Sequence, residues 1–269
     1  MGNSKRVIKL QENIYAVRGV WLNGLSFFNT YSYVLRSEKN NEILLIDTCG
    51  PGSGKFIKDA LELLGCMVSD ITGIALTHWH KDHTGSVAEI IETAGSSEKP
   101  VSIFMHRDDM DIFLKRKFKF LTIHPFMKMK IPHGPGKLPR NNFYNTVELN
   151  PAGGDNPLDV YDVQFIHTPG HTPGHTSYLY RKSMSLFSGC GLSLFGRNTV
   201  GIVPVFYDRK KQVESAKILA EMEYSYLYPA HLNVRKDEVK KENRVPFKGK
   251  IKRIDRITGT LPVFRYPKR

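Results

Sequence analysis

Three apolar stretches that lie far apart in the sequence each run directly into histidine. ITGIALT (71–77) leads into THWHKDHTG, VYDVQFI (160–166) leads into HTPGHTPGHT, and YLYPA (226–230) ends at His231. Short runs rich in β-branched and aromatic residues predict strands. In layered α/β folds the functional groups sit in loops at strand ends, and such ends can meet at one edge of a sheet. In an α/β sandwich these three ends can therefore converge on one edge.

The first of these loops is unusually dense in metal-binding side chains. THWHKDHTG places His78, His80, Asp82 and His83 within six positions, followed by Gly85 and an expected helix. Protonated imidazoles this close would repel one another, so the cluster makes chemical sense around a cation. Imidazole nitrogen and carboxylate oxygen suit zinc, iron and related ions. A histidine-rich surface loop and a set of hydrogen-bonded core histidines are the alternatives, and the position after a strand argues against both.

Strand, loop, helix and strand alternate through the first 105 residues, which favours a layered α/β architecture. The expected strands are 13–20, 27–36, 41–47, 71–77 and 101–105, and the expected helices are 56–65 and 86–95. Further along we expect a strand at 160–168, a hairpin at 178–189 turning at RKSM, a helix at 208–224 and a strand at 226–231. We expect one domain over 1–269, with 106–155 as an irregular basic insertion or lid.

Five motifs together resemble a known family. LLIDTC, THWHKDHTGS, HTPGHT, LFSGCGLS and YPAH resemble, in order, the five motifs of the metallo-β-lactamase superfamily, across about residues 13 to 231. The resemblance implies an αββα sandwich, in which two mixed sheets face each other, helices cover the outer faces and metal ions lie at one sheet edge. It also implies hydrolytic chemistry.

The resemblance implies roles for individual residues. His78, His80 and His171 correspond to the ligands of the first metal, and Asp82, His83 and His231 to those of the second. Asp82 would also orient the attacking hydroxide or accept its proton, and Asp47 corresponds to a supporting aspartate near the metal loop. The neighbours His167 and His175 are expected to support or pack rather than to bind the metal.

The fourth motif departs from the family pattern at Cys190, because LFSGC stands where the family usually has LFSGD with a bridging aspartate. One subclass of the metallo-β-lactamases also has cysteine at the comparable place, as a ligand of the second zinc only. Cys190 is either such a thiolate ligand or a small buried thiol. Zinc is the expected ion, as one or two ions, with iron or manganese as alternatives.

The expected activity is metal-dependent hydrolysis of an ester-type bond. A bound cation lowers the pKa of water and supplies hydroxide as the nucleophile. We favour a phosphoester, with a thioester hydrolase of the glyoxalase II type and a nucleic-acid-processing nuclease as alternatives. A true β-lactamase and a sulfur dioxygenase are disfavoured, the first by the lack of an export signal and the second by Cys190. His106, His124 and His133 are the candidates for an acid that protonates the leaving group.

The net charge of +13 is concentrated in two segments. Residues 107–140 hold nine Lys/Arg and three acidic residues, and the extension 235–269 holds thirteen and four. Such segments attract anions, so we expect a small anionic ester substrate. Nucleic acid is a less favoured partner, since the tail carries few aromatic residues for stacking. The tail could instead be an arm that joins two copies of the chain into a homo-oligomer.

Three cysteines without a CxxC pair argue against a disulfide framework. The sequence holds neither an apolar run long enough to cross a membrane nor an apolar stretch of signal-peptide length near its start. We therefore expect a cytoplasmic protein without a membrane partner.

Overall fold

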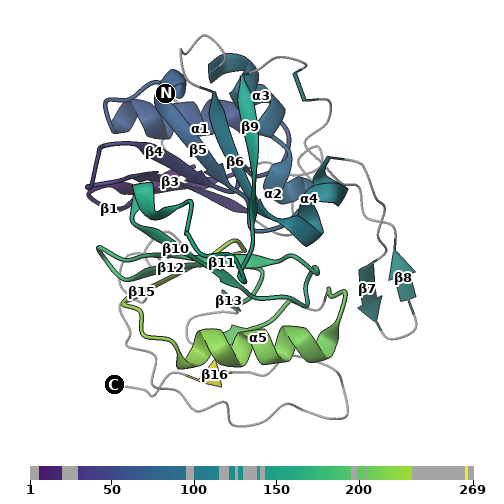
Figure 1. The fold of residues 1–269 in the computed structure, drawn as a ribbon. Helices are drawn as coiled ribbons and strands as arrows, with labels where there is room; N and C mark the ends of the chain where they lie inside the picture. The colour runs from purple at the N-terminus through teal and green to yellow at the C-terminus, as the bar shows by residue number, and fades with distance from the viewer. Residues whose placement is uncertain are drawn as a thin grey trace.

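The computed structural model describes residues 6–19, 30–94, 100–114, 121–124, 127–129, 138–139, 143–194, 199–203, 205–231 and 264–265. Within these residues the chain forms two main sheets that lie face to face (Figure 1). The extension 235–269 lies outside the described residues except for one short strand at 264–265, and its predicted roles stay predictions.

The larger sheet contains seven of the described strands, in the order β1-β2-β3-β4-β5-β6-β9. Its first four strands pair antiparallel, and the parallel pairs β4–β5, β5–β6 and β6–β9 complete it. The strands are β1 (Val7–Gln11), β2 (Ile14–Arg18), β3 (Tyr31–Arg36), β4 (Ile43–Ile46), β5 (Ile71–Ala75), β6 (Val101–His106) and β9 (Tyr144–Leu149).

The smaller sheet contains four described strands, in the order β10-β11-β12-β15. β10 (Val163–His167), β11 (Thr176–Tyr180) and β12 (Ser185–Gly189) form an antiparallel meander, and β15 (Tyr226–Pro229) pairs parallel with β12. The predicted hairpin at 178–189 is confirmed, because β11 and β12 pair on either side of residues 181–184.

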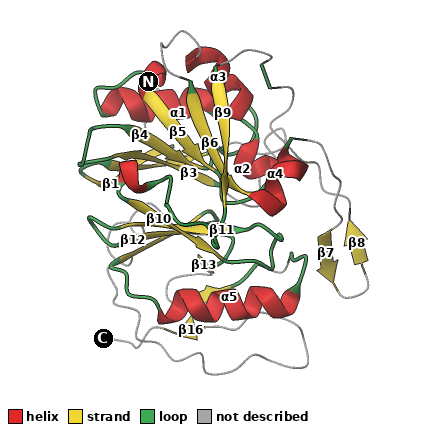
Figure 2. Cartoon of the chain, in the orientation of Figure 1, coloured by secondary structure: helices red, strands yellow, loops and turns green. Residues whose placement is uncertain are grey.

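Helices cover the outer face of each sheet (Figure 2). The helices α1 (Gly54–Leu63) and α3 (Val87–Ala94) lie on the larger sheet, and α5 (Arg209–Glu221) lies on the smaller one. The αββα architecture expected from the sequence is therefore confirmed.

Alternation along the strands explains the layers, since successive side chains point to opposite faces of a sheet. On β3, Tyr33 and Leu35 pack between the two sheets, while Val34 packs on the opposite side with the helices. On β12, Phe187 faces the larger sheet and Leu186 faces α5. Strands buried on both faces read as continuous apolar runs, as ILLI on β4 does.

The segment 106–155 is less irregular than predicted. It opens with helix α4 (Arg107–Phe113), capped by His106, and it closes with β9, which pairs with β6 along all six of its residues. The prediction missed β9 because its apolar residues do not alternate cleanly, and its partner β6 lies some forty residues earlier in the sequence. Whether the stretch between them acts as a lid stays a prediction.

Shorter elements complete the described chain. They are α2 (Lys81–Thr84), the single 3₁₀ turns Val68–Asp70 and Asp159–Tyr161, and the short strands β7 (Leu121–His124), β8 (Met127–Met129), β13 (Ser193–Leu194), β14 (Thr199–Gly201) and β16 (Phe264–Arg265). In the described part of the chain, none of the helices has the length and apolar character needed to cross a membrane.

Candidate metal centre

The three histidine-bearing loops meet at one edge of the two sheets, as predicted. His78 follows β5, His171 follows β10, and His231 follows β15. Backbone hydrogen bonds tie the loops together: the N–H of Thr176 donates to the carbonyl of Thr77 at 2.8 Å, and the N–H of Ala230 to that of Gly189 at 3.1 Å. Cys190 comes directly after Gly189, so the fourth motif reaches the same place.

Among the described residues, three groups of side chains have ligand atoms close enough together to hold one ion. In each group the atoms lie within 4.8 Å of one another: His78 with His80 and His171, His78 with His83 and Cys190, and Asp82 with His83 and His231. The seven residues proposed as ligands from the sequence are therefore all brought together.

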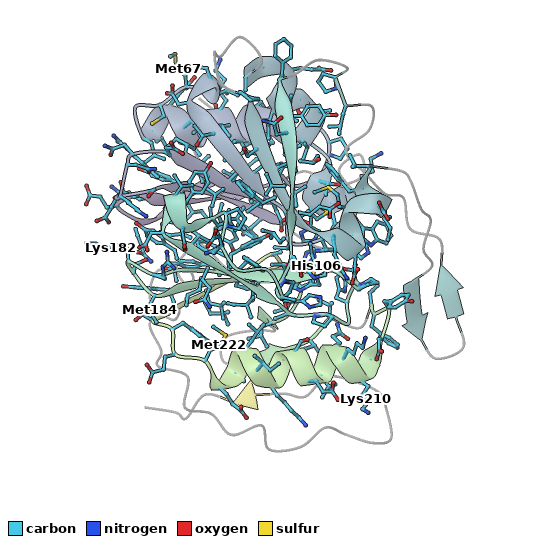
Figure 3. The ribbon with its side chains drawn as sticks, viewed as in Figure 1. Met67, His106, Lys182, Met184, Lys210 and Met222 are labelled. Carbon is cyan, nitrogen blue, oxygen red and sulfur yellow. The ribbon has the colours of Figure 1, made fainter. Side chains whose placement is uncertain are left out.

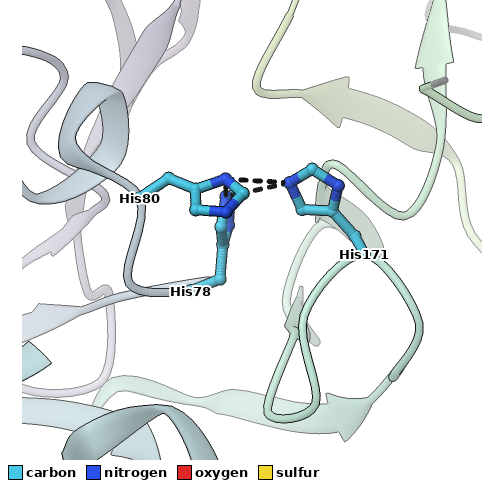
Figure 4. Close-up of side chains that lie close together, drawn as sticks. All are labelled: His78, His80 and His171. Carbon is cyan, nitrogen blue, oxygen red and sulfur yellow. Dashed lines mark hydrogen bonds between the residues drawn. The ribbon is translucent and has the colours of Figure 1, made fainter. Parts of the chain in front are cut away.

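The first group, called here the first position, consists of His78, His80 and His171 (Figure 4). His78 Nε2 lies 2.9 Å from His80 Nδ1, and His171 Nε2 lies 3.2 Å and 3.1 Å from these two atoms. Nitrogen ligands of a tetrahedral zinc with bonds of about 2.0–2.1 Å are spaced by about 3.3 Å. The donor set and its spacing thus fit a zinc ion.

The electrostatics of the first position also favour a metal ion over a proton. Burial, and then the neighbouring imidazoles, hold the pKa of His78 and of His80 well below the ordinary value. Both rings are therefore neutral near pH 7, which is the form that binds a metal.

The second ring nitrogens of His78 and His171 at the first position are held by neighbours. His78 Nδ1 lies 3.0 Å from the hydroxyl of Thr77, and His171 Nδ1 lies 2.8 Å from the carbonyl oxygen of Val205. A histidine ligand usually donates its second N–H in this way, which fixes its tautomer and its orientation. His80 Nε2 is buried without a hydrogen-bond partner among the described atoms.

The second position is formed by Asp82, His83 and His231. Asp82 Oδ2 lies 3.6 Å from Nε2 of both histidines. The side chains of Asp82 and His231 are 18% and 20% exposed, whereas His78 is fully buried, so the second position lies nearer the surface.

Acidic neighbours give the second position a different charge. Burial lowers the pKa of His83, but Asp82 and Asp47 outweigh it and raise that pKa well above the ordinary value. Burial likewise opposes protonation of His231, yet Cys190 and Asp82 raise its pKa.

Asp47 contacts a histidine of the second position directly and one of the first position through Thr77. It is 1% exposed, and its carboxylate accepts hydrogen bonds from His83 Nδ1 at 2.7 Å and from the backbone N–H of Thr77 at 2.8 Å. The Thr77 hydroxyl, which also contacts His78, donates to the same carboxylate at 2.8 Å. Asp47 has a left-handed φ of 57°, an uncommon backbone conformation for a residue other than glycine. The structure thus places Asp47 where the sequence predicted a supporting aspartate.

Cys190 lies beside the second position, with Sγ 3.7 Å from His83 Nε2. Burial raises the pKa of its thiol, but His171, His231 and His83 together lower it well below the ordinary value. A lowered pKa is compatible with a thiolate ligand, and the choice between such a ligand and a small buried thiol stays a prediction. The backbone N–H of Cys190 donates to His175 Nε2 at 3.0 Å, so His175 supports the fourth motif, as predicted for a histidine outside the ligand set.

The other histidines of the centre have supporting contacts. His167 Nε2 donates to the carbonyl of Pro173 at 2.9 Å, and its ring stacks on His106 with centroids 3.9 Å apart. Burial, followed by the neighbouring His167, lowers the pKa of His106 to about 4, so this candidate acid is neutral near pH 7. The side chain of His124 and the whole of His133 lie outside the described residues, and their predicted role stays untested.

Sequence reasoning missed the groups that hold the ligands from behind. Thr77 and the carbonyl of Val205 were not singled out, since their partners lie elsewhere in the chain or in the backbone. A threonine directly before the first histidine was the one visible signal.

Residues 25–231 match the family described as the Metallo-beta-lactamase superfamily, and the chain belongs to this family. The match covers the five motifs, the smaller sheet and the larger sheet from β3 onward, whereas β1 and β2 precede it. The superfamily is one of metallo-hydrolases, and the described donor groups could hold metal ions.

Individual relatives are more distant. "Beta-lactamase-like protein 2 homolog" of Drosophila melanogaster is 26% identical over 237 residues, covering 87% of this chain and 69% of the relative. "Atrochrysone carboxyl ACP thioesterase" of Aspergillus fumigatus is 22% identical and covers 97% of this chain, which spans only 51% of that protein. The solved structure of a metallo-beta-lactamase family protein from Thermus thermophilus has a TM-score of 0.57 at 19% identity, covering 86% of this chain and 77% of that one. The structural likeness shows the fold.

Proposed function

We propose that this protein is a metal-dependent hydrolase of an ester-type bond in a small anionic substrate. The observation that carries the proposal is the convergence of three imidazole nitrogens at one buried point, beside a second group that contains a carboxylate and a third that contains a thiol. A bound metal ion of this kind lowers the pKa of water so that a nucleophile is available near neutral pH.

The protein's own side chains would divide the work. His78, His80 and His171 would hold the first ion, and Asp82, His83 and His231 would hold a second one, with Cys190 as a further candidate ligand. Asp82, which is partly exposed and lies between His83 and His231, would orient the attacking water or accept its proton. Zinc is the ion that best suits a set of imidazole and thiolate ligands.

A phosphoester is the favoured bond. The support comes from the sequence, where residues 107–140 carry nine basic and three acidic residues, beginning with helix α4. Positive charge near a site raises the local concentration of anionic substrates.

A thioester is the second candidate, and a specific observation favours it. One relative is described as an acyl carrier protein thioesterase, and its match covers nearly the whole of this chain, at 97%. HTPGHTSYLY also resembles the third motif of the glyoxalase II type of thioester hydrolase. A thiolate leaving group needs no protonation, which agrees with the lack of an evident acid among the described residues.

The test is a panel of chromogenic substrates offered to the zinc-reconstituted protein at low salt. The panel holds a phosphodiester, a phosphotriester, a carboxylic ester, a glutathione thioester and a cephalosporin. We expect turnover of at least one ester, with the phosphodiester fastest. If the thioester is hydrolysed faster than the phosphodiester, the substrate is a thioester rather than a phosphoester.

The matched control is His78→Ala, prepared and reconstituted in parallel. Activity that persists in this variant comes from a contaminant or from another site, and would contradict the proposal. Zinc-loaded protein that turns over no member of the panel would also contradict it.

A further inference from the structure

Asp109 is a buried carboxylate that the proposed chemistry does not use. It lies in α4 and has no exposed surface. Burial raises the pKa of its carboxyl to about 7, although hydrogen bonds from Thr172 and Gly174 act in the opposite direction. A buried carboxylate is costly and is retained where it accepts hydrogen bonds that matter.

Both hydrogen bonds to Asp109 come from one turn, residues 172–174, which directly follows His171. The hydroxyl of Thr172 donates to Asp109 Oδ2 at 2.5 Å, and the backbone N–H of Gly174 donates to Oδ1 at 2.8 Å. The approach is close enough to require glycine, because a Cβ at position 174 would lie 2.8 Å from Asp109 Cγ. Helix α4 and this turn therefore pack closely against each other.

A second contact joins the same two parts of the molecule. The ring of His106, at the N-terminal end of α4, stacks on His167 at an interplanar angle of 9°. His167 in turn donates to the carbonyl of Pro173, within the turn, at 2.9 Å. Figure 3 labels His106, which precedes α4 and lies in the view between the larger and the smaller sheet.

The opposite side of His171 is held by the segment before α5. The backbone N–H groups of Tyr207 and Asp208 donate to the carbonyl of Gly170 at 2.8 Å and 2.9 Å. His171 is thus held from two directions. The segment before α5 contacts the carbonyl of Gly170 and the ring of His171, and α4 contacts Thr172 and Gly174. His78 and His80 lie on a different loop, the one that follows β5.

We propose that Asp109 is a positioning residue that fixes the 172–174 turn and thereby sets His171 against His78 and His80. The inference rests on the proposed metal centre. It predicts that loss of the Asp109 contacts weakens the first position while the second position keeps its affinity, since none of Asp82, His83 and His231 belongs to this turn.

The experiment measures zinc affinity by competition with a chelator, together with kcat and KM on the best substrate of the panel. Asp109→Asn keeps the shape but places a donor where an acceptor is needed. Loss of a residue that orients a metal ligand typically lowers metal affinity or activity about 10- to 100-fold. We expect a loss of this size in zinc affinity at the first position, and in kcat more than in KM.

Asp108→Asn is the matched control, because it removes the same charge one residue away. The Asp108 side chain is 49% exposed and pairs weakly with His106 and Arg107. We expect it to keep wild-type zinc affinity. Equal losses in the two variants would mean that charge, not the contact, is responsible, and would overturn the proposal.

Thr172 provides a test that does not depend on altering Asp109. Thr172→Val removes the hydroxyl at nearly constant shape, and Thr172→Ser restores it. The proposal expects weaker zinc binding in the first and recovery in the second. It also expects Asp109→Asn and Thr172→Val to be less than additive when combined, because they break one shared contact.

Two outcomes separate this inference from the proposed function. If the wild-type protein binds zinc but hydrolyses none of the panel, the zinc affinities still decide the role of Asp109. If Asp109→Asn lowers only the unfolding temperature and leaves the zinc affinity of its folded form unchanged, Asp109 is a purely structural residue and the proposal is wrong.

Discussion

The two positions of the metal centre differ in charge, exposure and spacing. The first consists of three imidazoles whose ligand atoms lie 2.9–3.2 Å apart and are nearly sealed from solvent. The second combines two imidazoles with a carboxylate, whose Oδ2 lies 3.6 Å from Nε2 of each histidine, and Cys190 Sγ lies beside it, 3.7 Å from His83 Nε2. The three neutral imidazoles of the first position are already spaced for one ion. At the second position the acidic neighbours raise the pKa of the histidines, so protons compete there with a metal ion.

The departure from the family pattern is at Cys190, whose Sγ lies within 4.8 Å of ligand atoms of His78 and His83. Cys190 stands where a bridging carboxylate is usual, and its Sγ lies near His83. A thiolate would bind the second ion without joining the two ions as a carboxylate does. The first position should therefore fill independently of the second, and this difference can be tested.

The largest expected effect is the loss of the first position. His171→Ala removes one of three nitrogen ligands, so activity should fall by more than the roughly 100-fold that loss of a supporting group causes. Metal content by mass spectrometry should fall with it, while the unfolding transition remains cooperative. If the His171→Ala variant kept its metal content and its hydrolysis rate, the assignment of His171 as a ligand would be wrong.

Asp47→Asn should weaken the second position more than the first, because Asp47 contacts His83 directly and reaches His78 only through Thr77. The change takes a charged acceptor away from His83 Nδ1, and a loss of about 10- to 100-fold in affinity for the second ion is expected. The exposed Asp155 supplies the control, as Asp155→Asn changes the same charge on the surface. Titration of the metal-free proteins with zinc measures both, and a uniform loss at both positions would break the distinction between them.

Two substitutions of Cys190 test whether its thiol binds the second ion. Cys190→Ser should lower zinc content toward one ion per chain, because it removes the thiolate and leaves the first position intact. Cys190→Asp, which restores the usual family residue, should bring the content back toward two. Unchanged stoichiometry in both variants would favour a packing role for this thiol.

The smallest expected effect is a difference in pH dependence. The pKa of His78 and of His80 is lowered, so both are neutral at pH 7 and the first ion displaces few protons. The pKa of His83 and of His231 is raised, so the second ion must displace protons, and its affinity should rise as pH rises through those values. Calorimetric zinc titrations in buffers of different ionisation enthalpy count the protons released. Equal release at the two steps would contradict the assigned charges.

Much of this centre could be predicted from the sequence because its ligands lie in short motifs after recognisable strands. His78, His80, Asp82 and His83 are local neighbours, and the apolar run before them marks a strand end. The architecture followed from the order of strands and helices and from the family resemblance.

Most of the supporting contacts could not be predicted because they join distant residues. Asp109 meets Thr172 across 63 positions, and His171 finds a backbone carbonyl 34 residues later, where residue identity carries no signal. The strand β9 was missed for the same reason, since it is defined by its pairing with β6 rather than by its own alternation.

The central claim is that His78, His80 and His171 hold a metal ion. The most direct test is anomalous diffraction at the zinc absorption edge from crystals of the zinc-loaded protein. The account predicts an anomalous peak at about 2.0–2.1 Å from the ligand nitrogens of these three residues. A zinc-loaded crystal with no peak among them, or with zinc held only elsewhere, would contradict it.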